Sequence, residues 1–196
     1  MWATAATADS AKDFVEAAMN GDYLTVKSFI ANGAIGHLKG NALLMASGNG
    51  HADVVQLLLD NGTYVDGRMD NGLTSLIFAS QNGHVDVVRL LLRKGAYVNA
   101  RTTDGVTALI IASANDHREV VRLLLDKWAE VNATTTGGVT ALMIASQNGH
   151  IEVVRLLLDK GAEVNAKTAG GATALMIASQ NGHIEVKEML IRAGAR

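Results

Sequence analysis

Histidine is the titratable residue that recurs most regularly in this chain of 196 residues, at His51, His84, His117, His150 and His183. Imidazole rings can bind metals or carry protons, so this ladder is the first candidate for chemistry. Its members lie 33 residues apart, and stacked helical layers are roughly 10 Å apart. Two such rings cannot share a zinc ion whose bonds are about 2 Å long. We therefore expect each histidine to bond to loop backbone instead.

Other patterns that support catalysis are missing from the sequence. The chain has no Cys, which excludes thiol catalysis, thiolate metal sites and disulfides. Serines recur at Ser80, Ser113, Ser146 and Ser179, which we expect to lie within helices. No Asp–His relay accompanies them, and no glycine-rich loop has the phosphate-binding pattern. We predict a chain that is not an enzyme and binds no cofactor or metal.

The composition limits both the core and the partners. Hydrophobic residues make up 48% of the chain but aromatic residues only 4%, so the core must consist of Leu, Val, Ile, Ala and Met. The net charge is −2 with both signs interspersed, which argues against nucleic acid or an anionic membrane as a partner. No apolar run approaches the roughly 20 residues of a membrane helix.

The period of 33 residues is shared by other residue types. Glycines keep it at Gly72, Gly105, Gly138 and Gly171, and alanines at Ala46, Ala79, Ala112, Ala145 and Ala178. A fixed period of this length predicts a solenoid, in which each repeat packs its apolar face on the next. One repeat reads GGVTALMIASQNGHIEVVRLLLDKGAEVNA, over residues 137–166.

This string resembles the ankyrin repeat, with G-x-T at the hairpin, A-x-x-x-G-H between two helices, V-V-x-L-L-L, and G-A-[DE]-V-N-A at the end. The resemblance implies an all-α solenoid of stacked helix-turn-helix repeats joined by extended hairpin loops. We assign residues 1–196 to one domain, with repeats at about 10–36, 37–68, 69–101, 102–134, 135–167 and 168–196. The first and last of these are the caps. The first hairpin, between Gly33 and Leu43, is four residues short.

The chain departs from the family at the start of the first helix, where T-P-L-H becomes T-[SA]-L-[IM] and Pro is absent. Apolar side chains replace the tetrad histidine at Ile77, Ile110, Met143 and Met176. We therefore expect a drier junction between hairpin and helix.

Local signals predict where each helix begins and ends. N-cap residues recur at Thr74, Thr107, Thr140 and Thr173, with Asn41 in the second repeat and a weaker signal at Ser10. The first helix of a repeat ends in Asn-Gly, at Asn49, Asn82, Asn148 and Asn181. Second helices open with acidic residues and predict the pairs Asp86–Arg89, Glu119–Arg122 and Glu152–Arg155.

The last repeat is predicted to be a cap that completes the array. Lys187 and Glu188 stand where earlier repeats have Val154 and Arg155, so the last helix would present polar residues to water. Deleting residues from Gly171 onward is expected to expose Val153, Val154 and Leu157.

The resemblance implies a module that binds a protein partner, and an enzyme that is inhibited or anchored would be one such partner. It places the contact surface at the hairpin tips and first-helix ends, where the side chains are richest in the third and fourth repeats. Tyr64 and Tyr97 occupy one position of neighbouring repeats, and each ring either contacts the partner or covers adjacent helix ends. With these two tyrosines and Trp128, the predicted partner-binding residues are Tyr64, Met69, Asp70, Asn71, Leu73, Gln81, Asn82, Tyr97, Thr103, Asp104, Val106, Ala114, Asn115 and Trp128. We expect a monomer when unbound.

Two alternatives stay open at this point. The fifth and sixth repeats share GATALMIASQNGHIEV almost unchanged, which also suits a structural or engineered consensus-like scaffold with no evolved partner. Trp128 and Asp116 replace glycines of the other repeats at places that favour a left-handed backbone. Trp128 is therefore either a contact residue kept despite strain or neutral drift.

The N-terminal residues bear on location. We expect a cytoplasmic protein, but the A-T-A segment that ends at Ala8 resembles the end of a signal peptide. If residues 1–8 are such a remnant, the protein is periplasmic or secreted.

Overall fold

The computed structural model describes residues 12–33 and 36–196. The predicted N-cap Ser10 and the export segment at residues 1–8 lie outside these ranges. Contacts cluster into two compact units, an N-terminal unit that ends at Tyr97 and a C-terminal unit that begins at Val98. The assignment of the chain to one domain stays a prediction.

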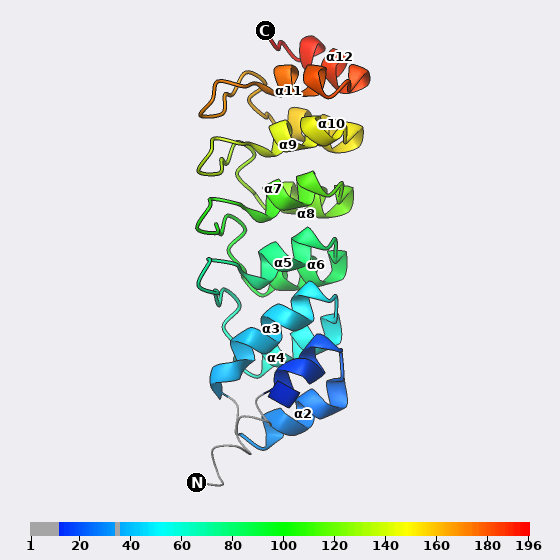
Figure 1. Cartoon of the computed structure of the whole chain (residues 1–196). Helices are drawn as coiled ribbons and strands as arrows, with labels where there is room; N and C mark the ends of the chain where they lie inside the picture. The colour runs from blue at the N-terminus through cyan, green and yellow to red at the C-terminus, as the bar shows by residue number, and fades with distance from the viewer. Residues whose placement is uncertain (1–11, 34–35) are drawn as a thin grey trace. The chain divides into compact units, whose positions relative to one another are not determined.

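The N-terminal unit is built from helices that pair in antiparallel order (Figure 1). Residues 12–19 are helical. The elements that follow are α2 (Tyr23–Ala31), the 3-10 helix η1 (Gly36–Leu38), α3 (Lys39–Gly48), α4 (Ala52–Asp60), α5 (Ser75–Gln81) and α6 (Val85–Arg93). A hairpin between α4 and α5 is closed by an isolated bridge that joins Arg68 to Thr74.

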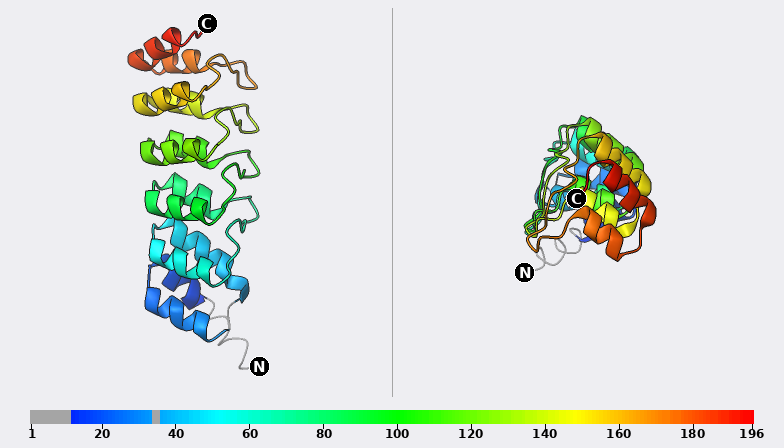
Figure 2. Two further views of the ribbon diagram at one scale, coloured as in Figure 1. Left: turned by 180° about the vertical axis from the view of Figure 1, so that it is seen from behind. Right: turned by 90° about the horizontal axis from the view of Figure 1, so that it is seen from above.

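The C-terminal unit contains three helix pairs, which follow one another as successive layers in the left view of Figure 2. They are α7 (Ala108–Ala114) with α8 (Arg118–Asp126), α9 (Ala141–Asn148) with α10 (Ile151–Asp159), and α11 (Ala174–Gln180) with α12 (Ile184–Arg192). Hairpins precede α7 and α9, with bridges from Arg101 to Thr107 and from Thr134 to Thr140. The prediction of an all-α repeat fold is confirmed.

Helix starts follow the predicted threonines. Each of the four accepts a hydrogen bond on its side-chain oxygen from the amide three residues on: Thr74 from Ile77, Thr107 from Ile110, Thr140 from Met143 and Thr173 from Met176. These bonds satisfy amides that have no partner inside the helix.

The cap predicted at Asn41 is wrong. Helix α3 begins at Lys39, directly after η1, and its N-cap is Leu38, whose side chain makes no capping bond. Asn41 therefore lies inside the helix. The physical reason is the shorter connection from Gly33: η1 continues into α3 and extends the helix past the point where the threonines of later repeats stop it.

The core is mainly aliphatic, as the composition predicts, but Phe14 is fully buried and packs edge-on against Phe29, which the prediction did not include. In α8, Val120, Val121 and Leu124 are fully buried, and the matching positions of α6 and α10 are buried too. The junction between hairpin and helix is dry, because Ile77, Ile110 and Met143 are all at most 6% exposed. No helix among the described residues is long and apolar enough to cross a membrane.

The predicted pairs along the second helices are mostly absent. Among the described residues only Glu152–Arg155 forms, at 3.1 Å. Asp86–Arg89 and Glu119–Arg122 do not form an ion pair there, because the attraction between exposed charges hardly exceeds the entropy cost of holding two long side chains. Ion pairs instead join neighbouring repeats: Lys94–Asp60 at 2.7 Å and Lys160–Asp126 at 2.9 Å.

The last described repeat presents a mixed surface. Lys187 and Glu188 are exposed, as expected, but Met176 is 50% exposed, whereas its counterpart Met143 is buried. Val186 and Leu190 are buried in the last repeat itself, so their counterparts Val153 and Leu157 do not depend on a following repeat. This burial argues that deletion from Gly171 would expose Val154 more than Val153 and Leu157, and the predicted effect of the deletion stays a prediction.

Candidate functional site

The histidine ladder bonds to backbone. In four of its members the ring Nε2 lies within hydrogen-bond distance of a main-chain oxygen of the preceding repeat: His51 to Met19 at 2.8 Å, His84 to Gly48 at 2.9 Å, His150 to Ala114 at 3.0 Å, and His183 to Gln147 at 2.9 Å. A carbonyl oxygen can only accept, so each Nε2 donates. Backbone bonding is confirmed for these four histidines, but the acceptors lie at the C-terminal ends of helices and not in loops as expected. These bonds tie one repeat to the next.

The described residues hold no group of three or more His, Cys, Asp or Glu side chains that could bind a metal ion. The recurring serines lie within the first helices, as predicted. Ser80, Ser113 and Ser146 are fully buried, and their hydroxyl oxygens have no hydrogen-bond partner. A buried hydroxyl with no base beside it cannot act as a nucleophile. These serines serve as small residues in the packing.

The predicted contact residues of the N-terminal unit lie mostly on its surface. Met69, Asp70, Asn71 and Gln81 are exposed, and Leu73 is half-buried. The hairpin tip has its own internal bond, because Asn71 Oδ1 accepts from the amide of Leu73 at 3.0 Å.

Two predicted aromatic contacts are also exposed in this unit. Tyr64 is 72% exposed and Tyr97 is 54% exposed, so neither ring is mainly occupied with covering helix ends. Asn82 is different, because its Nδ2 donates to the main-chain oxygen of Gly48 at 2.6 Å. Asn82 therefore has a structural role that its surface position did not reveal.

In the C-terminal unit, Thr103 and Asp104 are exposed at a hairpin tip, while Val106 and Ala114 are half-buried. The main-chain oxygen of Asp104 accepts from the amide of Thr136 at 2.9 Å, which joins this tip to the next hairpin. Asn115 is exposed and donates from Nδ2 to Ile111 O at 3.1 Å. Within this unit the tips therefore form a connected row of loops beside the first helices (Figure 1).

A family profile described as ankyrin repeats, in three copies, matches residues 14–102, 98–168 and 128–196. The chain belongs to the ankyrin repeat family. A search of curated proteins finds no significant match. Ankyrin repeats generally mediate protein–protein interaction and are generally non-catalytic, and the fold of this chain is the one that the sequence resemblance implies.

Asparagines of the V-N-A segment hold the ankyrin loops together, a role that the sequence analysis did not predict. Asn132 Oδ1 accepts from the amide of Glu163 at 2.8 Å, and its Nδ2 lies 3.4 Å from Gly161 O. Asn99 makes the same pair of bonds, since its Nδ2 donates to Trp128 O and its Oδ1 accepts from Glu130 N. Asn165 repeats them with Gly194 O and Arg196 N. The signal was present, since this Asn recurs every 33 residues in V-N-A. Asp66 replaces it and accepts from Tyr97 N at 2.9 Å.

The fourth ankyrin repeat is irregular at both ends of α8. Among the described residues, Asp116 and Trp128 are the two with positive φ that are not glycine, at 58° and 64°. Asp116 forms an ion pair with Arg118 at 3.4 Å. The left-handed backbone predicted at both positions is confirmed. The Trp128 side chain is 87% exposed.

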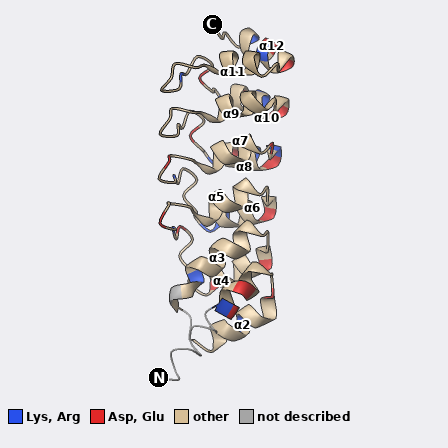
Figure 3. Cartoon of the chain, in the orientation of Figure 1, with Lys and Arg blue, Asp and Glu red and all other residues tan. Residues whose placement is uncertain are grey.

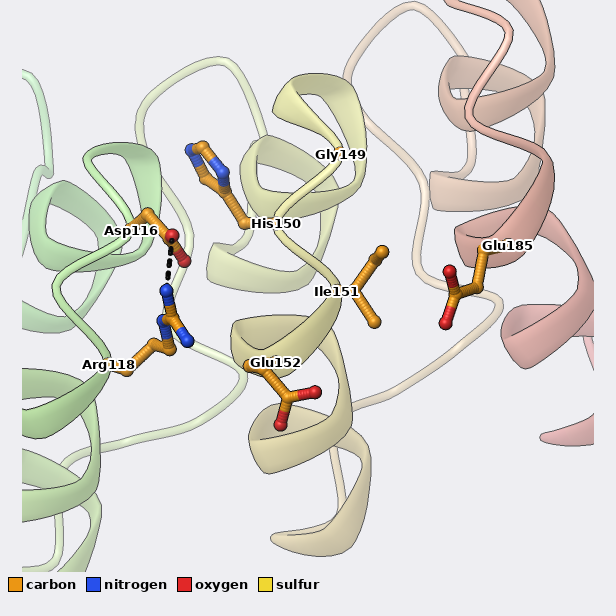
Figure 4. Close-up of a pocket in the computed structure, with 7 residues that line it drawn as sticks. All are labelled: Asp116, Arg118, Gly149, His150, Ile151, Glu152 and Glu185. Atoms are coloured by element: carbon orange, nitrogen blue, oxygen red, sulfur yellow. Dashed lines mark hydrogen bonds and ion pairs between the residues drawn. The ribbon is translucent and has the colours of Figure 1, made fainter.

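A hollow of about 310 Å³ lies beside the first of these positions (Figure 4). Its lining residues are Asp116, Arg118, Gly149, His150, Ile151, Glu152 and Glu185. In the close-up, Ile151 lies between Glu185 and the pair formed by Asp116 and Arg118. The two glutamates each belong to the first turn of a second helix, α10 and α12, where Figure 3 shows acidic residues. Their negative charges stabilise these helices by interacting with the positive end of the helix dipole, which is a structural role.

Proposed function

We propose that this ankyrin chain is a non-catalytic binding module whose partner is a protein, contacted through the hairpin tips and the ends of the first helices. The observation that supports this most is that the hairpin tips expose chemically varied side chains, whereas the recurring histidines bond to backbone and the recurring serines Ser80, Ser113 and Ser146 are buried. Met69, Asp70 and Asn71 offer an apolar, an acidic and an amide side chain to the solvent. No bond that holds the fold depends on the Met69 or Asp70 side chains.

The tips of the N-terminal unit supply more contact chemistry than those of the fifth and sixth repeats. There the corresponding residues are Thr136, Gly137 and Val139, and then Ala169, Gly170 and Ala172. Aromatic residues are enriched at protein interfaces, and Tyr64 and Tyr97 are exposed in the same unit as the richer tips. We infer that the partner contacts the second to fourth repeats, and an enzyme that is inhibited or anchored is one class of such a partner.

Affinity isolation with matched variants tests this proposal. The chain is immobilised, proteins retained from a host lysate and from a periplasmic extract are identified, and each retained protein is then titrated against purified variants. Asp70→Gly, Asn71→Gly and Leu73→Ala together should weaken a true partner by about tenfold or more.

The matched control combines Thr136→Gly, Val139→Ala and Gln147→Ala in the fifth repeat, which should have a much smaller effect. Equal losses from both sets, or a larger loss from the control set, would overturn the proposed polarity of the surface. If no retained protein depends on either set of tips, the proposal fails and a scaffold without an evolved partner is favoured.

A further inference from the structure

Asparagine followed directly by glycine recurs eight times in this sequence. Asparagine is chemically labile, and glycine has no Cβ that would shield its amide nitrogen from the side chain before it. Seven of these asparagines stand at the ends of helices, and one lies at the tip of a hairpin. The seven are Asn20, Asn32, Asn49, Asn61, Asn82, Asn148 and Asn181, and the one at the hairpin tip is Asn71.

Five of the helix-end asparagines are held by their own side chains. Nδ2 of Asn49, Asn61 and Asn181 donates to the carbonyl four residues earlier, at 2.8 Å in each case. Asn82 and Asn148 donate to a carbonyl of the preceding repeat, at 2.6 Å and 2.9 Å. Each bond directs the side chain away from the glycine that follows and occupies its amide nitrogen.

The other two helix-end asparagines are tied to a helix by the main chain. The amides of Asn20 and Asn32 donate to Glu16 O at 2.9 Å and to Ser28 O at 3.2 Å. Within the described ranges, neither has a side-chain bond that would bring its Cγ towards the next amide. These two sites therefore lack the arrangement that favours attack by the backbone.

The side chain of Asn71 points forward along the chain. Its Oδ1 accepts from the amide of Leu73 at 3.0 Å, which is an Asx turn. A bond to the second residue on brings Cγ close to the amide nitrogen of Gly72. The same N–H points at the oxygen that becomes negative when Cγ is attacked. Asn71 is exposed, and its Nδ2 donates to no other described residue.

The residue two places before Asn71 leaves this N–H available. In the fourth to sixth repeats the aligned residue is Thr, and its Oγ1 accepts from the corresponding amide, as Thr102 does from Val106 at 3.1 Å. Met69 has no oxygen in its side chain, so the amide of the third repeat bonds to the asparagine instead. The arrangement is therefore specific to one hairpin tip.

We propose that Asn71 is a site of spontaneous deamidation, at which the chain modifies its own hairpin tip. The amide of Gly72 loses its proton to hydroxide, and its nitrogen bonds to Cγ of Asn71. The Cγ–Nδ2 bond breaks, and ammonia leaves with a proton from water. Water then opens the succinimide, at Cγ to give aspartate or at the main-chain carbonyl to give isoaspartate. An amide and water become a carboxylate and ammonium, with no change of oxidation state.

The turn at this tip accommodates the aspartate product. Ring closure has to break the bond from Gly72 N to Met69 O, of 2.8 Å. The aligned turn of the next repeat has the same bond at 2.9 Å, with Asp104 in the place of Asn71. Isoaspartate adds one carbon to the main chain, so it does not reproduce this turn. Both products place a new negative charge beside Asp70 at neutral pH.

Peptide mapping by mass spectrometry tests the assignment on the full chain. The folded protein is aged in mildly alkaline heavy-oxygen water, so that only modification during ageing carries the label. Asn71 should convert at least about tenfold faster than each of the other seven asparagines. In urea-denatured protein all eight should react at similar rates, because the bonds that distinguish them are lost.

Variants of the neighbouring residue test the role of the Asx turn. Met69→Thr installs the residue of the next repeats, whose oxygen competes for the amide of Leu73. It should slow the reaction of Asn71 by about threefold or more. Met69→Leu is the matched control, because it offers no acceptor, and it should react as the wild type does.

Three results would overturn the proposal. The first is a helix-end asparagine that reacts as fast as Asn71 in the folded chain. The second is an equal rate at Asn71 in Met69→Thr and Met69→Leu. The third is a folded chain in which Asn71 stays unchanged while the denatured chain converts completely.

The consequence for binding rests on the function proposed above, but the modification itself does not. A new charge at the tip alters the electrostatic match between the contact surface and a partner. Asn71→Asp should therefore change the affinity for a retained partner by about threefold or more. If Asn71 deamidates as expected and this variant binds as the wild type does, the proposed contact surface fails and the modification site stands.

Discussion

The imidazole of His150 donates from Nε2 to the main-chain oxygen of Ala114 across 3.0 Å, although 36 positions separate the two residues. Asn148 donates from Nδ2 to the same oxygen at 2.9 Å. Ala114 is the last residue of α7, so its carbonyl has no partner further along that helix. Two side chains of the next repeat therefore cap the helix of the previous one.

Double substitution should reveal this shared acceptor. Because either donor alone still satisfies the Ala114 oxygen, His150→Ala and Asn148→Ala should each lower the free energy of unfolding by about 1 kcal/mol. The double variant loses both donors, so the two losses should couple by about 0.5–3 kcal/mol. Urea denaturation of the four proteins of the cycle measures the coupling, and strictly additive losses would contradict a shared acceptor.

A pair of glycines separates steric contact from backbone strain. Gly149 and Gly182 have nearly the same φ, 73° and 74°. A Cβ on Gly149 would lie 2.6 Å from Nδ1 of His183, whereas a Cβ on Gly182 would meet nothing within 4 Å. Both alanine variants should lose about 1–2 kcal/mol from the positive φ. Gly149→Ala should lose clearly more, and equal thermal denaturation of the two variants would rule out the predicted clash.

Removing the strain at Trp128 should stabilise the chain. Trp128→Gly is expected to raise the free energy of unfolding by roughly 1 kcal/mol, measured on dilute protein by chemical denaturation. The reverse substitution, Gly161→Trp at the aligned position of the next repeat, is the control. Gly161 has a φ of 83° with open space around it, so its replacement should cost about 1–2 kcal/mol without a clash. Destabilisation by Trp128→Gly would mean that the ring is packed and the strain argument fails.

Deleting residues 171–196 should expose the positions that only the next repeat covers. Met143 and Val154 are buried, whereas their counterparts Met176 and Lys187 in the last repeat are exposed. Each newly exposed side chain of this size costs about 1.5–3 kcal/mol. The truncated chain should melt at a lower temperature and bind more of a hydrophobic dye. A truncated chain as heat-stable as the full one would refute the role of this repeat as a cover.

One contribution to acid sensitivity should come from Asp22, the N-cap of α2. The hydrogen bond with Thr25 holds the pKa of this carboxyl below its usual range. Because the folded-state pKa is depressed, the stabilisation is present above the unfolded pKa and is lost as the pH falls through the folded value, below about pH 4. Asp22→Asn should make the loss of stability in that window shallower.

Denaturation at a series of pH values measures this slope. Thr173→Asn is the control, because it also changes an N-cap residue but removes no titrating group. Its slope should match that of the wild type. An unchanged slope in Asp22→Asn would show that other carboxyls account for the acid sensitivity.

Much of the fold could be predicted because positions that align between repeats have the same backbone conformation and the same local hydrogen bonds. Thr107 and Thr140 occupy one register position and cap their helices by the same bond. The positive φ of Trp128 was predictable for the same reason, since the aligned residues are glycines. The prediction of an N-cap at Asn41 was wrong because the shorter first hairpin moves the start of α3 to Lys39. Asn41 therefore aligns in sequence with the capping threonines but lies inside the helix.

The candidate site was less predictable, for two physical reasons. Surface asparagines look alike in a sequence, but whether one faces solvent or a neighbouring carbonyl depends on how loops approach each other. Asn82 bonds to Gly48, whereas Asn71 bonds within its own tip. A hollow such as that beside Asp116 arises from residues of three repeats, and no linear pattern marks it.

The asparagine of V-N-A bears on how such a chain can grow. Asn132 holds the loop that carries Glu163, and Asn165 holds the backbone of Arg196, each 31 residues further on. The repeats that carry Asn99, Asn132 and Asn165 thus contain the attachment point for their successors. An insertion of 33 residues in phase would arrive with its own attachment, whereas an insertion of another length would separate donor from acceptor. Duplication in whole repeats is therefore structurally tolerated, and the near-identity of residues 138–153 and 171–186 is what this tolerance permits.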